Sequence, residues 1–281
     1  MMNVTVDVKG LTKKFMDRGK RTTILNRVTF DAKRSQIFAI IGPNASGKTT
    51  LLKVLSTIFL PDGGSARIMG YDIVRQAKKV REVSSFTSPA LTFQKKLTLR
   101  EVLKFYAGTI NKDFEAVIPF LNECGMFKLL DESVEGFSEG QKMLARIAIA
   151  LLKDPQVLML DEPTAPLDAQ KKEFLIKFLR KYAENRTLLV VDHNPDTIGQ
   201  LCTDFLLLAR GGKVVKKGTM DSFFAGFPYR FALIITPRGY VPTNVLNGLG
   251  KPYQKNPDGT LSILLNERDE AEKMVNSLMK D

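Results

Sequence analysis

Hydrophobic and polar residues alternate in some parts of this chain and form unbroken apolar runs in others. Residues 4–8 alternate, which is typical of a strand with one face in water. Apolar runs at residues 37–41, 157–160 and 188–191 predict buried strands, and the last two have the profile of central strands in a parallel sheet. Further strands are predicted at residues 22–30, 66–69, 205–208 and 213–215.

Helical periods lie between these strands. They predict helices at residues 51–60, 73–82 and 168–184. Thr98 and Glu101 have capping-box spacing, and Ser138 and Gln141 repeat that spacing before another apolar stripe. Residues 98–152 are therefore expected to form a block that is nearly all helical. Residues 84–96 show no period and are broken by Pro89, so the sequence predicts no element there.

The pattern changes near residue 219. Prolines become closely spaced, and strand-like runs at residues 229–236 and 260–265 flank most of them. A last helix is expected to carry Ala271, Met274, Val275 and Leu278 on one face. We therefore expect a large domain at residues 1–218 and a small α+β extension at residues 219–281.

Composition narrows the class of protein. The 281 residues are 44% hydrophobic, which is enough for a large buried core. No apolar stretch approaches the ~20 residues that span a bilayer, and the first residues do not predict a secretory signal. The only cysteines, Cys124 and Cys202, stand far apart, which argues against a disulfide scaffold or a metal cluster and fits a reducing cytoplasm.

The net charge is +12, and the sequence pI is about 9.6. Nucleic acid or lipid headgroups would suit such a charge, but so would a solvated surface rich in lysine. The basic residues come in scattered pairs, without a long run of like charges or interleaved aromatic residues. Charge alone therefore does not decide the kind of partner.

The strongest motif is G-x-x-x-x-G-K-[ST], in the run Gly42-Pro43-Asn44-Ala45-Ser46-Gly47-Lys48-Thr49-Thr50. It stands between an apolar strand and an apolar helix, the context that a phosphate-binding loop requires. Gly42 and Gly47 lack a Cβ, so the amides can point inward at a helix N-terminus. Lys48 is expected to reach the β- and γ-phosphates, and the Thr49 hydroxyl to bind Mg²⁺. A chance glycine turn before a lysine is the weaker alternative, because every fixed position and both flanks match.

A pair of acids, Asp161 and Glu162, follows the apolar run at residues 157–160. A carboxylate at the end of a buried strand beside the phosphate loop can hold Mg²⁺, usually through water. The next carboxylate can act as general base toward a water molecule. Two solvated acids at a strand end are the alternative, which the following run at residues 163–168 makes less attractive.

In their order, these motifs resemble the nucleotide-binding subunit of an ATP-binding cassette (ABC) protein, from about residue 4 to residue 218. Residues 42–50 resemble the Walker A loop, and residues 157–162 the Walker B strand with its catalytic glutamate. The run Phe137-Ser138-Glu139-Gly140-Gln141 is similar to the signature L-S-G-G-Q, and residues 165–168 to the loop that crosses the dimer interface. The resemblance implies an α/β P-loop NTPase (RecA-like) core, an antiparallel β subdomain, and a helical subdomain inserted at about residues 89–152.

The resemblance also implies roles for single residues. Phe15 would stack on adenine, although an ordinary core phenylalanine is the alternative. His193 would contact the γ-phosphate; it is the only histidine and directly follows an apolar strand, which favours this role over a structural one. In a head-to-tail pair, the ATP of one subunit would meet residues of the other subunit's signature: Ser138, Gly140 and Gln141.

The sequence departs from the family pattern at three places. Ala45 replaces a glycine of the phosphate loop, at small cost if its φ is negative. Glu139 brings a negative charge toward the γ-phosphate of the other subunit. The family's glutamine after the strand that precedes the helical block is missing, and Ser88 is expected to take its place at Mg²⁺.

The resemblance implies an ATP hydrolase on the cytoplasmic face of the membrane. It would use ATP and Mg²⁺, pair with a second nucleotide-binding subunit, identical or not, and drive a separate transmembrane permease. The short extension is similar to those of two-component exporters. A cleft near residues 84–103, with Phe86, Leu91 and Phe93, is expected to receive a helix of the permease.

Two other classes of protein are less well supported. A soluble ABC ATPase of DNA repair or translation would be favoured only by the charge, since the chain lacks a heptad insertion, a second cassette and iron–sulfur cysteines. No nucleic acid is therefore expected as a partner. A GTPase would need N-K-x-D, and residues 111–114 lack the final aspartate.

Overall fold

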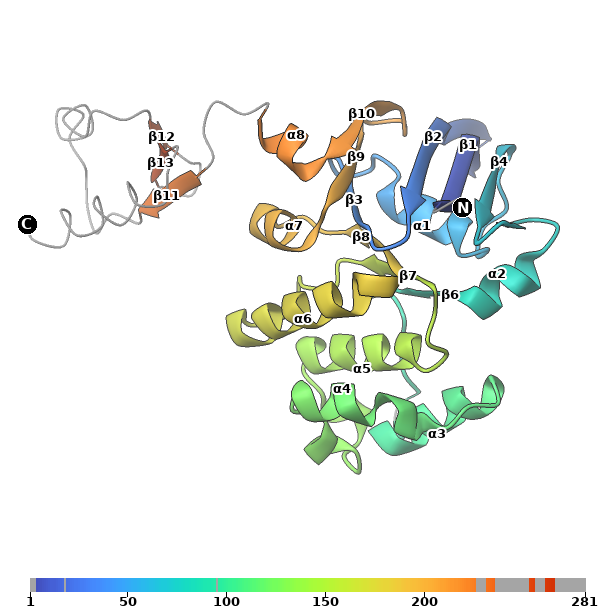
Figure 1. Cartoon of the computed structure of the whole chain (residues 1–281), viewed down its shortest axis with the longest axis vertical. Helices are drawn as coiled ribbons and strands as arrows, with labels where there is room; N and C mark the ends of the chain where they lie inside the picture. Colours follow the sequence, from blue (N-terminus) through green and yellow to red (C-terminus); the bar gives the residue numbers. More distant parts are fainter. Residues whose placement is uncertain are drawn as a thin grey trace, which may run out of the picture. The chain divides into compact units, whose positions relative to one another are not determined.

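Two sheets and a helix packed between them carry the phosphate-binding loop (Figure 1). The computed structural model describes residues 4–17, 19–94, 96–225, 231–235, 253–255 and 261–265. The chain divides into two compact units, residues 1–220 and 221–281.

The first unit contains a six-stranded sheet of order β10-β9-β3-β8-β7-β6, parallel except for β10. Its strands are β3 (Ile37–Ile41), β6 (Ser84–Thr87), β7 (Val157–Asp161), β8 (Thr187–Val191), β9 (Asp204–Leu208) and β10 (Val214–Thr219). Every residue of β7 and β8 is buried, which confirms the prediction of central strands. Strand β6 was not predicted, because four residues are too few to establish a period.

The second sheet is antiparallel, with the order β2-β1-β4-β5. Its strands are β1 (Val4–Asp17), β2 (Lys20–Lys33), β4 (Gly63–Ile68) and β5 (Tyr71–Asp72). Strand β1 is much longer than the alternating residues 4–8. Register shifts between Val8 and Leu11 and between Leu11 and Lys13 interrupt the alternation, so the sequence pattern ends where the strand continues.

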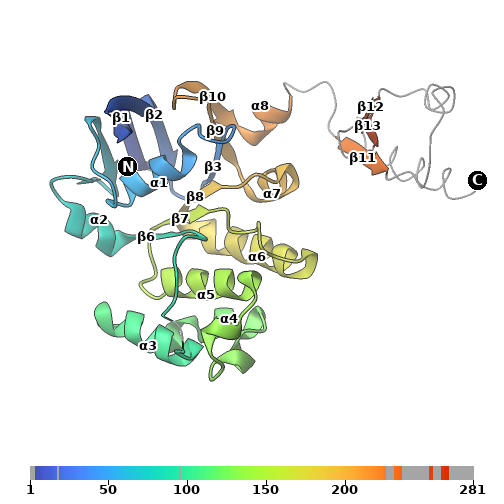
Figure 2. The same cartoon turned by 180° about the vertical axis from the view of Figure 1, so that it is seen from behind.

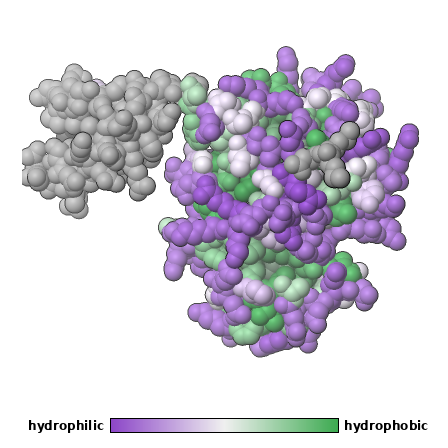
Figure 3. All heavy atoms as spheres, viewed as in Figure 1, coloured by the Kyte–Doolittle hydropathy of each residue, from purple (hydrophilic) through white to green (hydrophobic). Residues whose placement is uncertain are grey.

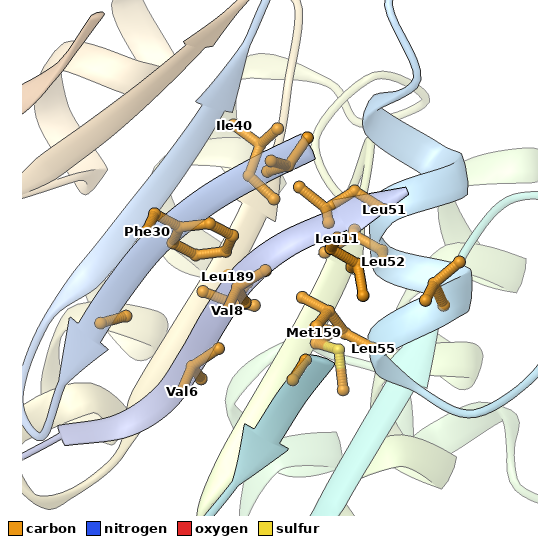
Figure 4. Close-up of a cluster of buried hydrophobic side chains, with 14 of the residues drawn as sticks. Val6, Val8, Leu11, Phe30, Ile40, Leu51, Leu52, Leu55, Met159 and Leu189 are labelled. Atoms are coloured by element: carbon orange, nitrogen blue, oxygen red, sulfur yellow. The ribbon is translucent and has the colours of Figure 1, made fainter. Parts of the chain in front are cut away.

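Helix α1 (Lys48–Leu55) packs its apolar face between the two sheets (Figure 4). Leu51, Leu52 and Leu55 are fully buried against Leu11 of β1 and Met159 of β7. Because β3 enters this core and α1 leaves it, the loop that joins them is held at both ends.

The remaining helices include both predicted capping boxes. The side chains of Thr98 and Ser138 accept hydrogen bonds from the backbone N–H groups of Glu101 and Gln141, and both glutamate and glutamine reach back to the cap. Helices α3, α4 and α5 gather at the end of the unit farthest from the four-stranded sheet (Figures 1 and 2). The helices are α2 (Ala77–Val83), α3 (Leu99–Thr109), α4 (Ile118–Glu123), α5 (Glu139–Leu151), α6 (Ala169–Tyr182), α7 (Pro195–Leu201) and α8 (Met220–Phe224).

Hydrophilic residues cover most of the face of the first unit shown in Figure 3, with hydrophobic residues in separate patches. Among the described helices, none is both long and apolar enough to cross a membrane.

The second unit contains a three-stranded antiparallel sheet of order β11-β13-β12. Strands β11 (Phe231–Ile235) and β13 (Leu261–Leu265) confirm the two predicted runs, whereas β12 (Tyr253–Lys255) was not predicted. The expected last helix, with Ala271 and Leu278, lies outside the described residues.

Candidate functional site

The loop at residues 42–47 follows β3 and admits only glycine at its two ends. A Cβ on Gly42 would stand 2.4 Å from the backbone oxygen of Leu208. A Cβ on Gly47, whose φ is +94°, would stand 2.6 Å from the backbone oxygen of Ile24. Both neighbours are backbone atoms of strands, Leu208 of β9 and Ile24 of β2, so they cannot move aside cheaply.

Ala45 has a φ of +62°, in the left-handed region. The expectation of a small cost assumed a negative φ, and the structure corrects it. In the left-handed conformation the Cβ of an L-residue crowds the following carbonyl, at a cost of roughly 1–2 kcal/mol. The loop therefore carries strain where the family's glycine would have little.

Lys48 and Ser46 direct polar groups into the loop. Lys48 is 6% exposed, and its ammonium group donates to the backbone oxygens of Gly42 at 2.8 Å and Pro43 at 3.0 Å. Burial lowers the pKa of Lys48, while the carboxylates of Glu162 and Asp161 raise it. The Ser46 hydroxyl is buried and has no hydrogen-bond partner among the described residues. Such a cradle of buried donors suits an anion.

Thr49 and Asp161 meet at the start of α1 and the end of β7. The Thr49 hydroxyl donates to Asp161 Oδ1 at 3.1 Å. Asp161 is 5% exposed; burial is the main cause that raises its pKa, and the Thr49 hydrogen bond opposes this. Among the described residues no cluster of three or more His, Cys, Asp or Glu could hold a metal. A hydroxyl and one carboxylate fit Mg²⁺, which takes few protein ligands and completes its shell with phosphate and water.

Glu162 faces His193 across the ends of β7 and β8. Glu162 Oε1 and His193 Nε2 are 3.1 Å apart, and both side chains are partly exposed, at 38% and 46%. The backbone of Glu162 has a φ of +51°, and its N–H donates to the oxygen of Val191 at 2.7 Å. A left-handed glutamate is uncommon, and here a backbone hydrogen bond to the neighbouring strand holds it.

A buried polar link lies behind this pair. The Thr164 hydroxyl donates to Asp192 Oδ2 at 2.6 Å and lies 3.2 Å from the Thr197 hydroxyl. Asp192 Oδ1 accepts from the N–H of Asn194 at 2.8 Å. Residues on both sides of His193 are thus tied to the segment after Glu162. No pattern in the sequence indicates this link, because it joins polar residues 28 positions apart.

One cavity of about 460 Å³ brings the predicted residues of four segments together. Its aromatic wall is Phe15, which is half-buried and packs edge-on against Phe59, with ring centroids 5.3 Å apart. Ile24 of β2 also lines it and was not predicted, since nothing in the sequence distinguishes it from other strand residues. The full lining is Phe15, Ile24, Asn44, Ala45, Ser46, Gly47, Lys48, Thr49, Thr50, Glu162 and His193.

The predicted signature residues Ser138, Gly140 and Gln141 do not line this cavity. Ser138 is exposed at the start of α5, where it caps the helix. A Cβ on Gly140 would stand 2.8 Å from the backbone oxygen of Pro166, so the signature packs tightly against residues 165–168.

Glu139 forms an ion pair with Lys142 at 3.0 Å and lies 3.8 Å from Arg146. The hydrogen bond from Lys142 is the main cause that lowers the pKa of Glu139. Two cations of the same helix therefore offset the negative charge that departs from the family pattern.

Ser88 is 4% exposed and follows β6, whose pairing of Thr87 with Leu160 brings Ser88 level with Asp161. It lines a second cavity, of about 530 Å³, instead of the one that contains the phosphate loop. Its predicted role at Mg²⁺ stays a prediction.

A scan of protein families gives a match to the model described as "ABC transporter" over residues 25–165. This chain belongs to the ABC transporter family. As a member of it, the subunit binds and hydrolyses ATP, and the family's ATP-binding subunits act in pairs and with a transmembrane permease.

Individual relatives agree with this membership of the ABC family. The chain is 26% identical over 219 residues to the ABC transporter ATP-binding protein NatA of Bacillus subtilis, a match that covers 76% of this chain and 89% of that protein. It is 28% identical over 220 residues to the Nod factor export ATP-binding protein I of Mesorhizobium japonicum, covering 76% and 64% of the two chains.

Solved ABC structures share the fold. The ATP-binding subunit of an ABC transporter superposes with a TM-score of 0.71 at 26% identity, covering 79% of this chain and 92% of that one. A dimeric cassette in a post-hydrolysis state with ADP and phosphate gives a TM-score of 0.70 at 22% identity, covering 76% and 98%. At that lower identity the likeness concerns the fold alone.

Proposed function

We propose that this ABC subunit is the ATP-hydrolysing motor of an exporter whose membrane-spanning permease is a separate chain. The observation that carries the catalytic part is the pairing of Glu162 with His193 beside the phosphate loop. Relatives named for Nod factor export and for probable multidrug transport support export as the direction.

The chain's residues then divide the work of hydrolysis. Lys48 exchanges its two carbonyl partners for the β- and γ-phosphates, and the loop amides and Ser46 bind the same anion. Thr49 and Asp161 would hold Mg²⁺, which would neutralise charge on the phosphates. Ser88 is proposed to reach the same ion, level with Asp161.

Glu162 takes the proton of the attacking water, and His193, whose Nε2 lies 3.1 Å from Glu162 Oε1, orients that carboxylate and contacts the γ-phosphate. Phe15, in the wall of the same cavity, stacks on adenine.

A second subunit completes the site. The exposed Ser138, with Gly140 and Gln141 at the N-terminus of its α5, is proposed to approach the γ-phosphate from across a head-to-tail interface. Hydrolysis removes the bridging phosphate and reopens the pair.

The permease is proposed to dock at the second cavity, which places the subunit peripherally on the cytoplasmic face of the membrane. Phe86 and Leu91 line that cavity as expected, whereas Phe93 lines a different one and lies under Arg146, 5.5 Å from its guanidinium carbon. Phe93 is therefore a poorer probe of docking than the sequence predicts.

Glu162→Gln tests the catalytic assignment. The amide keeps the shape of the side chain but is a far poorer base, so ATP turnover should fall by about 10²–10⁴-fold with ATP binding retained. Gel filtration with ATP and Mg²⁺ should then show a persistent dimer. The control is Glu173→Gln on the exposed face of α6, which should hydrolyse ATP like the parent. Near-parental turnover of Glu162→Gln would show that another group is the base.

A further inference from the structure

Three charged side chains lie along one face of helix α5, which starts inside the signature. Glu139, Lys142 and Arg146 are three and four positions apart, so they share that face of the helix. All three line a cavity of about 460 Å³ together with residues of the segment that follows β6. Gly140 instead faces the loop at residues 165–168. The charged face of α5 is therefore distinct from the face that packs against that loop.

The N-terminus of α5 keeps backbone donors available. The Ser138 hydroxyl accepts a hydrogen bond from the N–H of Gln141 at 3.2 Å. Among the described residues, the N–H groups of Glu139 and Gly140 form no hydrogen bond. Such groups and the helix dipole favour an anion at the start of a helix. A carboxylate held at the same place would occupy these donors or repel the anion, so the position of the Glu139 carboxylate matters.

The Glu139 carboxylate is engaged by side chains of the charged face. Its Oε1 accepts a hydrogen bond from the Lys142 ammonium group at 3.0 Å, and its Oε2 lies 3.8 Å from Nη2 of Arg146. Within the described part of the chain, it accepts no hydrogen bond from a backbone N–H. Arg146 is itself fixed, since its side chain is 5% exposed and its Nε donates to the oxygen of Leu91 at 2.7 Å. The carboxylate therefore leaves the donors at the start of α5 free.

The charges around this carboxylate are balanced. Two acids and two bases line the cavity: Glu135, Glu139, Lys142 and Arg146. The hydrogen bond from Lys142 is the main cause that lowers the pKa of Glu139, so Glu139 is ionised at neutral pH. Burial lowers the pKa of Arg146 and the charge of Glu139 raises it, and a guanidinium stays protonated in either case. Without Lys142, the Glu139 carboxylate would keep only the more distant of its two cations.

We propose that Lys142 and Arg146 are positioning residues of the interface between two subunits. They hold the Glu139 carboxylate on the side of α5, so that the N–H groups at the start of the helix can reach the γ-phosphate of the other subunit's ATP. The inference rests on the proposed function, which brings the signature to that phosphate, and adds the residues that make an acidic signature compatible with it. Without this restraint, a carboxylate beside the phosphate would oppose closure of the pair, because like charges repel strongly where water is excluded.

The ATP-dependent dimer expected of Glu162→Gln provides the test, with its dissociation constant measured by sedimentation velocity. Adding Lys142→Met should weaken this dimer by about tenfold, because Glu139 loses its nearer counter-charge. Adding Glu139→Gln as well should restore the affinity to that of Glu162→Gln with Glu139→Gln alone, because no carboxylate then needs restraint. Lys177→Met is the matched control: it removes a lysine from an exposed ion pair with Glu173 on α6 and should leave the dimer unchanged.

The outcomes separate the inference from the proposed function. If Glu162→Gln forms no dimer with ATP and Mg²⁺, the proposed pairing of subunits is wrong and the inference fails with it. If the dimer forms and Lys142→Met leaves it unchanged, or if Glu139→Gln does not restore the loss, the positioning role is wrong and the proposed function stands.

Ionic strength distinguishes the charge of Lys142 from a merely structural contribution. Raising the salt concentration from about 0.05 M to about 0.5 M should strengthen the Lys142→Met dimer relative to the dimer with Lys142 intact, because salt screens the repulsion between Glu139 and the phosphate. Thermal melts verify that the variants are folded. A loss of affinity that salt does not reduce would overturn the proposal.

Discussion

Ala45 stores strain in the phosphate loop, because its Cβ occupies a left-handed backbone with φ +62°. Ala45→Gly should relieve roughly 1 kcal/mol and raise Tm by about 2–4 °C in a thermal melt without nucleotide. Ala148→Gly in the middle of α5 is the control of opposite sign, and should lower Tm, since glycine costs ~1 kcal/mol in a helix. An unchanged or lower Tm for Ala45→Gly would mean that Ala45 stabilises the protein, by restricting the unfolded chain, at least as much as its strain destabilises it.

Asp161 is a second residue whose destabilising effect on the fold can be measured. Burial raises its pKa in the fold, so the ionised carboxylate is less favourable there than in the unfolded chain. The penalty is fully present above the folded pKa and disappears as pH falls below the unfolded value. Asp161→Asn should therefore raise Tm of the nucleotide-free protein at pH 7, and the difference should shrink toward pH 4.

The same substitution removes the charge proposed to hold Mg²⁺, so ATPase activity should fall by roughly 10²-fold or more. In Asp161→Asn the side-chain amide oxygen can still accept the hydrogen bond from Thr49. The variant therefore removes the negative charge and keeps the hydrogen bond. A variant that is no more stable at pH 7, or that hydrolyses ATP normally, would contradict this reading of Asp161.

The residues that the sequence could predict are those whose chemistry is local. Gly42, Gly47 and Lys48 form one motif, and the structure brings them together because a single loop carries them. Ile24 and the Thr164–Asp192 link depend on segments that are distant in sequence. No spacing rule finds such contacts, and the φ of Ala45 depends equally on how the loop closes over α1.

At the scale of elements, helix α5 packs its first turn against residues 165–168 without space for a methyl group. Gly140→Ala would bring a Cβ to 2.8 Å from the Pro166 oxygen. The net loss should be about 1–2 kcal/mol after the gain in helix propensity, and ATPase activity should fall as well. Gly136→Ala is the control in the same stretch, since nothing lies within 4 Å of its Cβ, and it should change Tm little. Equal Tm values for the two variants would show that the backbone at Pro166 moves aside at little cost in stability.

Elements were predictable where the apolar period is unbroken. Strands β7 and β8 and both capping boxes follow directly from their sequence patterns. The strand predicted at residues 4–8 was too short, because bulges interrupt the alternation of β1, and β6 was missed because its two serines, a phenylalanine and a threonine show no pattern. Its place beside β7 is set by the sheet, which residues far away in sequence complete.

At the scale of the whole molecule, every residue that lines the nucleotide cavity belongs to the first unit. A chain ending at residue 225, after α8, should therefore bind a fluorescent ATP analogue within about twofold of the full chain. Titration at equal protein concentration measures this, with circular dichroism to verify folding. A well-folded truncated chain with much weaker binding would give the second unit a part in the nucleotide site.

The hydrogen bond between Thr164 and Asp192 has a mechanical consequence. Thr164 stands between Glu162 and the loop proposed to cross the dimer interface, and Asp192 stands beside His193. Because the bond is short and shielded from water, a displacement of that loop would be transmitted to the backbone beside His193 as well as to that of Glu162. The arrival of a second subunit would then be felt by both groups at once. The hydrogen bond would thus make ATP cleavage in one subunit depend on the presence of the other.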